Sequence, residues 1–230
     1  MDFNFSLLYK FKTMESFSLL HNANIIIHVT SGSIALIIGL IALLTKKGKT
    51  GHKRAGKFFL FFLTIVIITG LIGVFIFGRN TFLLVITVLS GYLGYSGYRI
   101  LKTKSNKPQL TDIAINLLSI LCVIYFLYYF KSVRMIWNPI IIYSTIGYFI
   151  FISAYDLLRY LIPTKHYKNL WLFEHILKMV SALSGLFSAF TGTVFPQYQP
   201  YSQFMPSVLG TIVAISFIIV TYKKQKPLIY

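Results

Sequence analysis

Acidic residues and cysteine are scarce in this sequence. Only five of the 230 residues are Asp or Glu, and charged residues of both signs make up 12% of the chain. A soluble domain contains about a quarter charged residues, so no stretch here is polar enough to form a separate soluble domain. The single cysteine, Cys122, lies in an apolar run and therefore forms neither an intramolecular disulfide nor a thiolate-metal cluster.

Motifs of soluble enzymes are also missing. The chain has no nucleophile elbow, no phosphate-binding loop and no zinc-protease box. No acid–base pair is specific enough to name a reaction, so the sequence leaves open whether the protein is an enzyme.

Long apolar segments dominate what is present, since 56% of the residues are hydrophobic and the mean hydropathy is +0.72. Each segment is near the roughly 20 residues that a helix needs to cross about 30 Å of hydrocarbon. None shows the alternation of a lipid-facing barrel strand, so helices are expected. We therefore predict an all-α polytopic transmembrane bundle of about seven helices, at 24–45, 58–78, 81–101, 110–130, 137–159, 171–195 and 205–222.

Basic residues predict the orientation of this bundle. The net charge of +17 would suggest nucleic acid in a soluble protein, but here the lysines lie in loops between spans, which is typical of the positive-inside bias. One side carries Lys46, Lys47, Lys49, Lys53, Arg54, Lys57, Arg99, Lys102, Lys104, Lys107, Arg159, Lys165, Lys168, Lys223, Lys224 and Lys226, and the other carries Lys10, Lys12, Arg79, Lys131 and Arg134.

The charge difference places the N-terminus outside and the C-terminus in the cytoplasm. We expect an external segment at 1–23, a seven-helix transmembrane domain at 24–222 and a cytoplasmic tail at 223–230. The expected surroundings are the lipid bilayer of the bacterial cytoplasmic membrane, with no nucleic-acid partner.

Three of the five acidic residues, Asp112, Asp156 and Glu174, fall near the predicted cytoplasmic ends of three spans. Ionisable groups at such depth are costly unless they are paired, solvated or functional. One interpretation is a set of salt bridges that tie helix ends together. The other is a vestibule for a proton, an ion or an anionic headgroup. The basic residues expected at similar depth are Arg99, Arg159 and Lys178.

Two histidines, His52 and His175, are also expected near the cytoplasmic boundary, on different helices. Such a pair can ligate a b-type haem, and Gly56 would let the ring approach the backbone. His28 lies about one turn into the first span from the outside, where it serves either as a hydrogen-bonded bundle histidine or as a ligand or proton carrier.

Small and aromatic residues mark two further features. Gly91, Gly94 and Gly97, and likewise Gly185, Ser188 and Gly192, recur at helical spacing and predict close helix contacts. The outer loop 196–206, PQYQPYSQFMP, is either an aromatic belt at the membrane interface or a docking surface for a membrane-protein partner.

An ordered set of short motifs resembles a bacterial membrane-protein family, domain of unknown function 2306. The set begins with His28, Gly32 and Gly39 and continues through the short segments GHKRAGKFF (51–59), GYR (97–99), 156–159, FEHILKM (173–179), AFTG (189–192) and MPSVLG (205–210). The resemblance implies a bundle of seven or so helices, with His28, His52 and His175 at motif positions. It implies no established activity.

Three functions therefore remain open. The first is haem binding or electron transfer through His52 and His175. The second is transport of an ion or small molecule through the cluster of Asp112, Asp156 and Glu174. The third is a non-catalytic membrane subunit that docks a partner through 196–206.

Overall fold

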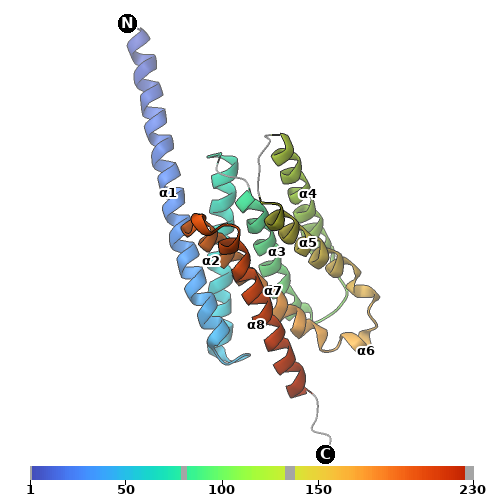
Figure 1. Cartoon of the computed structure of the whole chain (residues 1–230). Helices are drawn as coiled ribbons and strands as arrows, with labels where there is room; N and C mark the ends of the chain where they lie inside the picture. Colours follow the sequence, from blue (N-terminus) through green and yellow to red (C-terminus); the bar gives the residue numbers. More distant parts are fainter. Residues whose placement is uncertain (1, 79–81, 133–137, 226–230) are drawn as a thin grey trace, which may run out of the picture. The chain divides into compact units, whose positions relative to one another are not determined.

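A computed structural model describes residues 2–78, 82–132 and 138–225 of the chain, with side chains for 17–78, 84–132 and 138–224 (Figure 1). Every regular element in the described part is a helix. In chain order these are α1 (Asp2–Leu44), α2 (Thr50–Phe75), α3 (Phe82–Thr103), α4 (Leu110–Ser132), α5 (Pro139–Leu158), the 3₁₀ helix η1 (Arg159–Leu161), α6 (Thr164–Tyr167), α7 (Leu170–Val194), the 3₁₀ helix η2 (Pro196–Tyr198) and α8 (Tyr201–Gln225).

Six of the described helices are long and apolar enough to cross a membrane, which indicates a multi-pass membrane protein. The prediction of an all-α bundle of membrane-crossing helices is confirmed to this extent. The six spans are Phe17–Leu44, Thr50–Phe75, Leu110–Ser132, Pro139–Leu161, Leu170–Val194 and Tyr201–Lys224. α3 is outside this set because tyrosines, glycines and Arg99 lower its hydropathy.

Several helices extend past the predicted apolar segments. α1 runs without a break from Asp2, so residues 2–23 belong to the same helix as the first predicted span, and their external location stays a prediction. No Gly or Pro precedes Gly32 to stop it. α2 begins at Thr50, not at 58, and α8 at Tyr201, not at 205. The predicted span edges at 81 and 137, and the side chains of Lys10, Lys12, Arg79, Arg134 and Lys226, lie outside the described residues.

The chain divides into two compact units, 1–80 and 81–230, and the predicted domain 24–222 covers parts of both. The first unit is a pair of helices, α1 and α2, that pack side by side and antiparallel (Figure 1). The turn between them contains Gly48 at φ +74°, a left-handed conformation that suits glycine.

In the second unit, α7 packs along both α3 and α8, and α4 and α5 join on the α3 side (Figure 1). Close contacts occur where glycine replaces a side chain. A Cβ at Gly97 of α3 would lie 3.0 Å from the Cβ of Lys178, and one at Gly185 of α7 would lie 2.5 Å from Ser90 Oγ. Small residues thus let α3 and α7 approach closely, and this contact positions Lys178.

Candidate functional site

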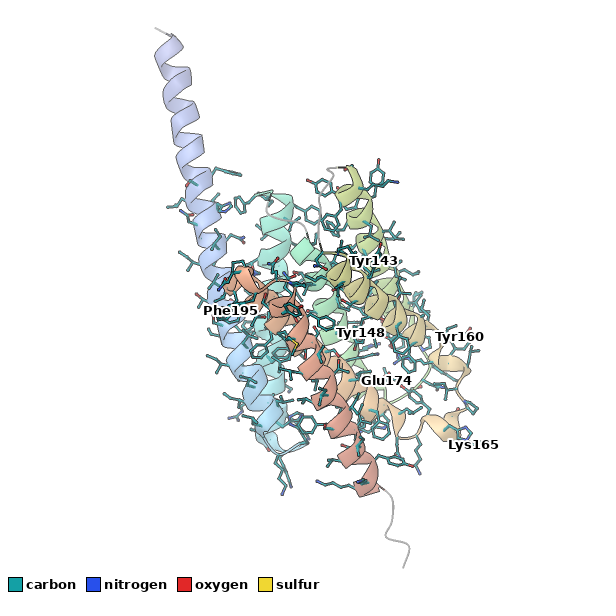
Figure 2. The ribbon with its side chains drawn as sticks, viewed as in Figure 1. Tyr143, Tyr148, Tyr160, Lys165, Glu174 and Phe195 are labelled. Carbon is teal, nitrogen blue, oxygen red and sulfur yellow. The ribbon has the colours of Figure 1, made fainter. Side chains whose placement is uncertain are left out.

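Four charged side chains form a buried network in the second unit: Asp156, Arg159, Glu174 and Lys178. Their side chains are between 1% and 8% exposed. Asp156 and Arg159 come from the end of α5 and from η1, and Glu174 and Lys178 lie one turn apart near the start of α7. Figure 2 shows Glu174 near the same end of the unit as Tyr160, which follows α5, with Tyr143 toward the other end.

Ion pairs connect all four members of this buried network. Lys178 Nζ lies 2.5 Å from Asp156 Oδ1 and 3.5 Å from Glu174 Oε2. Arg159 Nη1 lies 3.0 Å from Glu174 Oε2 and 3.9 Å from Asp156 Oδ1. Two carboxylates and two cations balance in charge. The balance matters because a buried charge without a partner costs several kcal/mol.

Tyrosine hydroxyls satisfy the remaining carboxylate oxygens. Tyr92 donates to Asp156 Oδ2 at 2.6 Å, and Tyr155 and Tyr167 both donate to Glu174 Oε1 at 2.7 Å. Burial, with the charge of Glu174 and the hydrogen bond to it, raises the pKa of the Tyr167 phenol above its usual range. Tyr167 therefore remains a donor at physiological pH.

Amide and hydroxyl groups from α4 and α5 hold the Tyr92 hydroxyl in place. Asn116 of α4, itself 1% exposed, donates from Nδ2 to the Tyr92 hydroxyl at 2.6 Å and to the Ser153 carbonyl at 3.1 Å. Ser153 Oγ donates back to Asn116 Oδ1 at 2.6 Å. The buried network is thus supported from α3, α4, α5 and α7.

Asp112, the third predicted acid, forms a separate surface pair with Arg99. Arg99 Nε donates to Asp112 Oδ1 at 2.9 Å, and the two side chains are 26% and 12% exposed. Asp112 also accepts from the backbone N–H of Gln109 at 3.2 Å. This contact, from the first turn back to the residue before α4, is half of a capping box, so Asp112 also stabilises the start of its helix.

A small pocket joins the surface pair to the buried network. Its volume of about 10 Å³ is room for about one water molecule. Its lining includes Arg99 and Asp112 of the surface pair together with Asp156 and Arg159 of the buried network. Two atoms of lining residues, Ser96 Oγ and Arg159 Nε, are buried without a hydrogen-bond partner among the described residues. The pocket therefore offers a polar position between the surface and the buried charges.

The three motif histidines contact backbone or hydroxyl groups. His52 Nδ1 lies 2.9 Å from the Ala42 carbonyl oxygen in the first unit, and His175 Nδ1 lies 2.8 Å from the Gly97 carbonyl oxygen in the second. Inside the first unit, a Cβ at Gly56 would meet no neighbouring atom. No group of three or more His, Cys, Asp or Glu side chains in the described ranges is arranged to hold a metal ion.

His28 links the two helices of the first unit. Its Nδ1 lies 2.9 Å from Thr69 Oγ1, which donates its own hydrogen to the Ile65 carbonyl at 2.7 Å. The donor and acceptor roles of His28 Nδ1 and Thr69 Oγ1 follow the histidine tautomer. Asn24 Nδ2 also donates to the Thr69 carbonyl at 3.1 Å. The contact is that of a hydrogen-bonded histidine between paired helices.

The segment 196–206 presents aromatic side chains. Tyr198 is 63% exposed and Tyr201 69%, and both an interfacial belt and a docking surface expose such residues. The docking of a partner at this segment stays a prediction.

The sequence predicted every charged member of the site but none of the tyrosines or the asparagine–serine pair that support it. Tyr155 and Tyr167 both bond Glu174 from other helices, α5 and α6, so sequence spacing offered no signal for these two. Tyr92 gave none, because its contact with Asp156 crosses from α3 to α5.

Comparison of the chain with models of protein families, with curated proteins and with solved structures finds no match.

The coupling within the buried network is testable by substitution. Lys178→Met leaves Asp156 and Glu174 facing Arg159 alone, and we expect it to lower the free energy of unfolding by about 3–5 kcal/mol. Adding Asp156→Asn leaves one anion facing one cation and should recover a large part of the loss. Denaturant unfolding of the purified protein in detergent measures the free energy of unfolding of each single variant and of the double variant. If the costs of the two single substitutions simply add in the double variant, the network is not coupled.

Proposed function

We propose that the chain is an ion transporter of the bacterial cytoplasmic membrane with seven spans. The buried network is its ion-binding site on the cytoplasmic side. The single observation that carries this proposal is a charge-balanced network, almost fully buried in a membrane-type helical unit, with a polar pocket beside it. Ionisable groups inside membrane bundles are expensive and typically line ion or substrate pathways.

The seventh span is α3. Its 22 residues extend about 33 Å, enough for the hydrocarbon core. Because α3 packs against α7 and α4, much of its surface faces protein, and a helix so placed can carry tyrosines and glycines that a lipid-facing helix disfavours. Seven spans put the strongly basic loops on one side, with the N-terminus outside and the C-terminus in the cytoplasm. The order of the sequence motifs supports a relation to domain of unknown function 2306.

In this orientation the pocket and the buried network lie toward the cytoplasm. Lys178 faces two carboxylates, at 2.5 and 3.5 Å. It can therefore shift from Asp156 to Glu174 without losing a counter-charge, which frees Asp156 to bind an arriving cation. Arg159 holds Glu174 in place during the exchange. The pocket has room for about one water molecule, which favours a small ion over an organic solute.

Asp156→Asn tests this proposal. Asparagine keeps the shape of the side chain and an acceptor for Tyr92 but removes the charge, so we expect ion flux into reconstituted vesicles to fall at least about tenfold. Lys224→Gln, which removes an exposed charge at the end of α8, is the control and should transport like the unmodified protein. Equal flux in the Asp156→Asn variant would contradict the assignment.

Haem binding is a second candidate, favoured by the contacts of His52 and His175. Each places Nδ1 against a backbone carbonyl. In haem and metal sites this contact fixes the tautomer that presents Nε2 to the metal. His52 belongs to the first unit and His175 to the second. The open space at Gly56 within its own unit fits the approach of a flat ring.

An optical spectrum of the protein purified from haem-supplied cells tests the second candidate. Haem ligation predicts a b-type signal in the reduced-minus-oxidised spectrum that is lost when the ligating histidine is replaced, in His52→Ala or in His175→Ala. His166→Ala, at an exposed histidine, serves as the control. A spectrum without that signal would exclude haem binding.

A further inference from the structure

Polar residues continue along α7 beyond the buried network. Lys178, Ser181, Ser184, Ser188 and Thr191 follow Glu174 at steps of three or four residues, so they share one broad face of the helix. We call the six residues the polar stripe. From Glu174 to Thr191 they cover 18 residues, a rise of about 25 Å, which is most of the hydrocarbon thickness.

The polar stripe meets different helices along its length. Ser181 Oγ lies 2.7 Å from the Tyr148 hydroxyl of α5. Farther along, Ser188 Oγ lies 2.9 Å from Ser207 Oγ of α8. Thr191 Oγ1 donates to the Ser202 carbonyl at 2.5 Å. The stripe thus passes from the buried network to the start of α8 at the opposite end of the unit.

Three buried side chains beside the polar stripe each have a polar atom that lacks a hydrogen-bond partner among the described residues. These atoms are Arg159 Nε at the pocket, Ser90 Oγ, which faces Gly185 about halfway along α7, and Oε1 of Gln203, whose side chain packs against Gly192 at the far end. These residues are 5%, 4% and 4% exposed. Leaving such a group unpaired costs about 1–3 kcal/mol, and an internal water is the ordinary remedy. Ser96 Oγ, at the pocket with Arg159, and Ser202 Oγ, next to Gln203 in the sequence, also lack a partner among the described residues.

We propose that water held at these three positions joins the polar stripe into a path for protons through the second unit. This inference rests on the proposed ion transport and names its ion. A hydroxyl or a water can accept one proton and release another, so a proton crosses each step while the O–H bonds made equal those broken. Asp156 takes the arriving proton as Lys178 moves to Glu174, and the pocket water then accepts it. A hydrated metal cation requires more room than one water position supplies.

Ser90→Ala separates a conducting role from a structural one. Ser90 Oγ has no protein partner in the described residues, so its removal costs no protein hydrogen bond and should leave thermal unfolding unchanged or at a higher temperature. If Ser90 holds a water of the path, proton flux should fall at least about tenfold. Ser216→Ala, at an exposed serine of α8 that bonds only its own helix, is the matched control and should conduct normally.

The flux is measured in vesicles that contain the full chain and a pH-sensitive dye, with a potassium diffusion potential to drive protons inward. Gln203→Leu provides an independent variant at the far end and should also lower the flux. Normal proton flux in both Ser90→Ala and Gln203→Leu would overturn the path. Uptake of sodium or rubidium that depends on Asp156, without proton flux, would overturn the proton assignment and leave ion transport standing. No flux of any of these ions would overturn both.

Discussion

The ion pair between Lys178 and Asp156 is the interaction on which the second unit depends. An ammonium group that is 1% exposed in an apolar surrounding must have a carboxylate beside it, and here the distance is 2.5 Å. Gly97 lets α3 approach the α7 backbone at this level, and Tyr92 brings a donor from α3 to the second oxygen of Asp156. The packing of α3, α5 and α7 is therefore set by the same charges that make the unit a candidate transporter.

Much of the fold follows from the sequence because apolar runs and basic loops are long-range averages that need no tertiary information. α4 was predicted at 110–130 and ends at Ser132. Helix ends were less predictable at α1, α2 and α8, because helices can continue beyond an apolar run: α2 runs through Thr50–Lys57 despite Gly51 and Gly56, and α8 runs through Pro206. Apolar runs indicate where lipid begins, whereas backbone hydrogen bonds decide where a helix ends.

The candidate site was predictable in its charges and not in its connections. Glu174 and Lys178 are four apart, so their contact can be inferred from helix geometry. The division into a buried network and a surface pair could not be inferred, because it depends on which helices touch. Nor could the roles of Asn116 and Ser153, which meet across α4 and α5. His28 was left between two interpretations, and its contact with Thr69 is compatible with both.

The most direct test of the proposed transport site is whether α3 crosses the membrane, because the site lies toward the cytoplasm only if it does. Lys49→Cys, before α2, and Gln109→Cys, before α4, are compared in a Cys122→Ser background with a thiol reagent that does not cross membranes; both native residues are exposed. We predict that both cysteines react in everted vesicles and neither in intact cells. Reaction of the two from opposite sides would show that α3 does not cross, and would contradict the account.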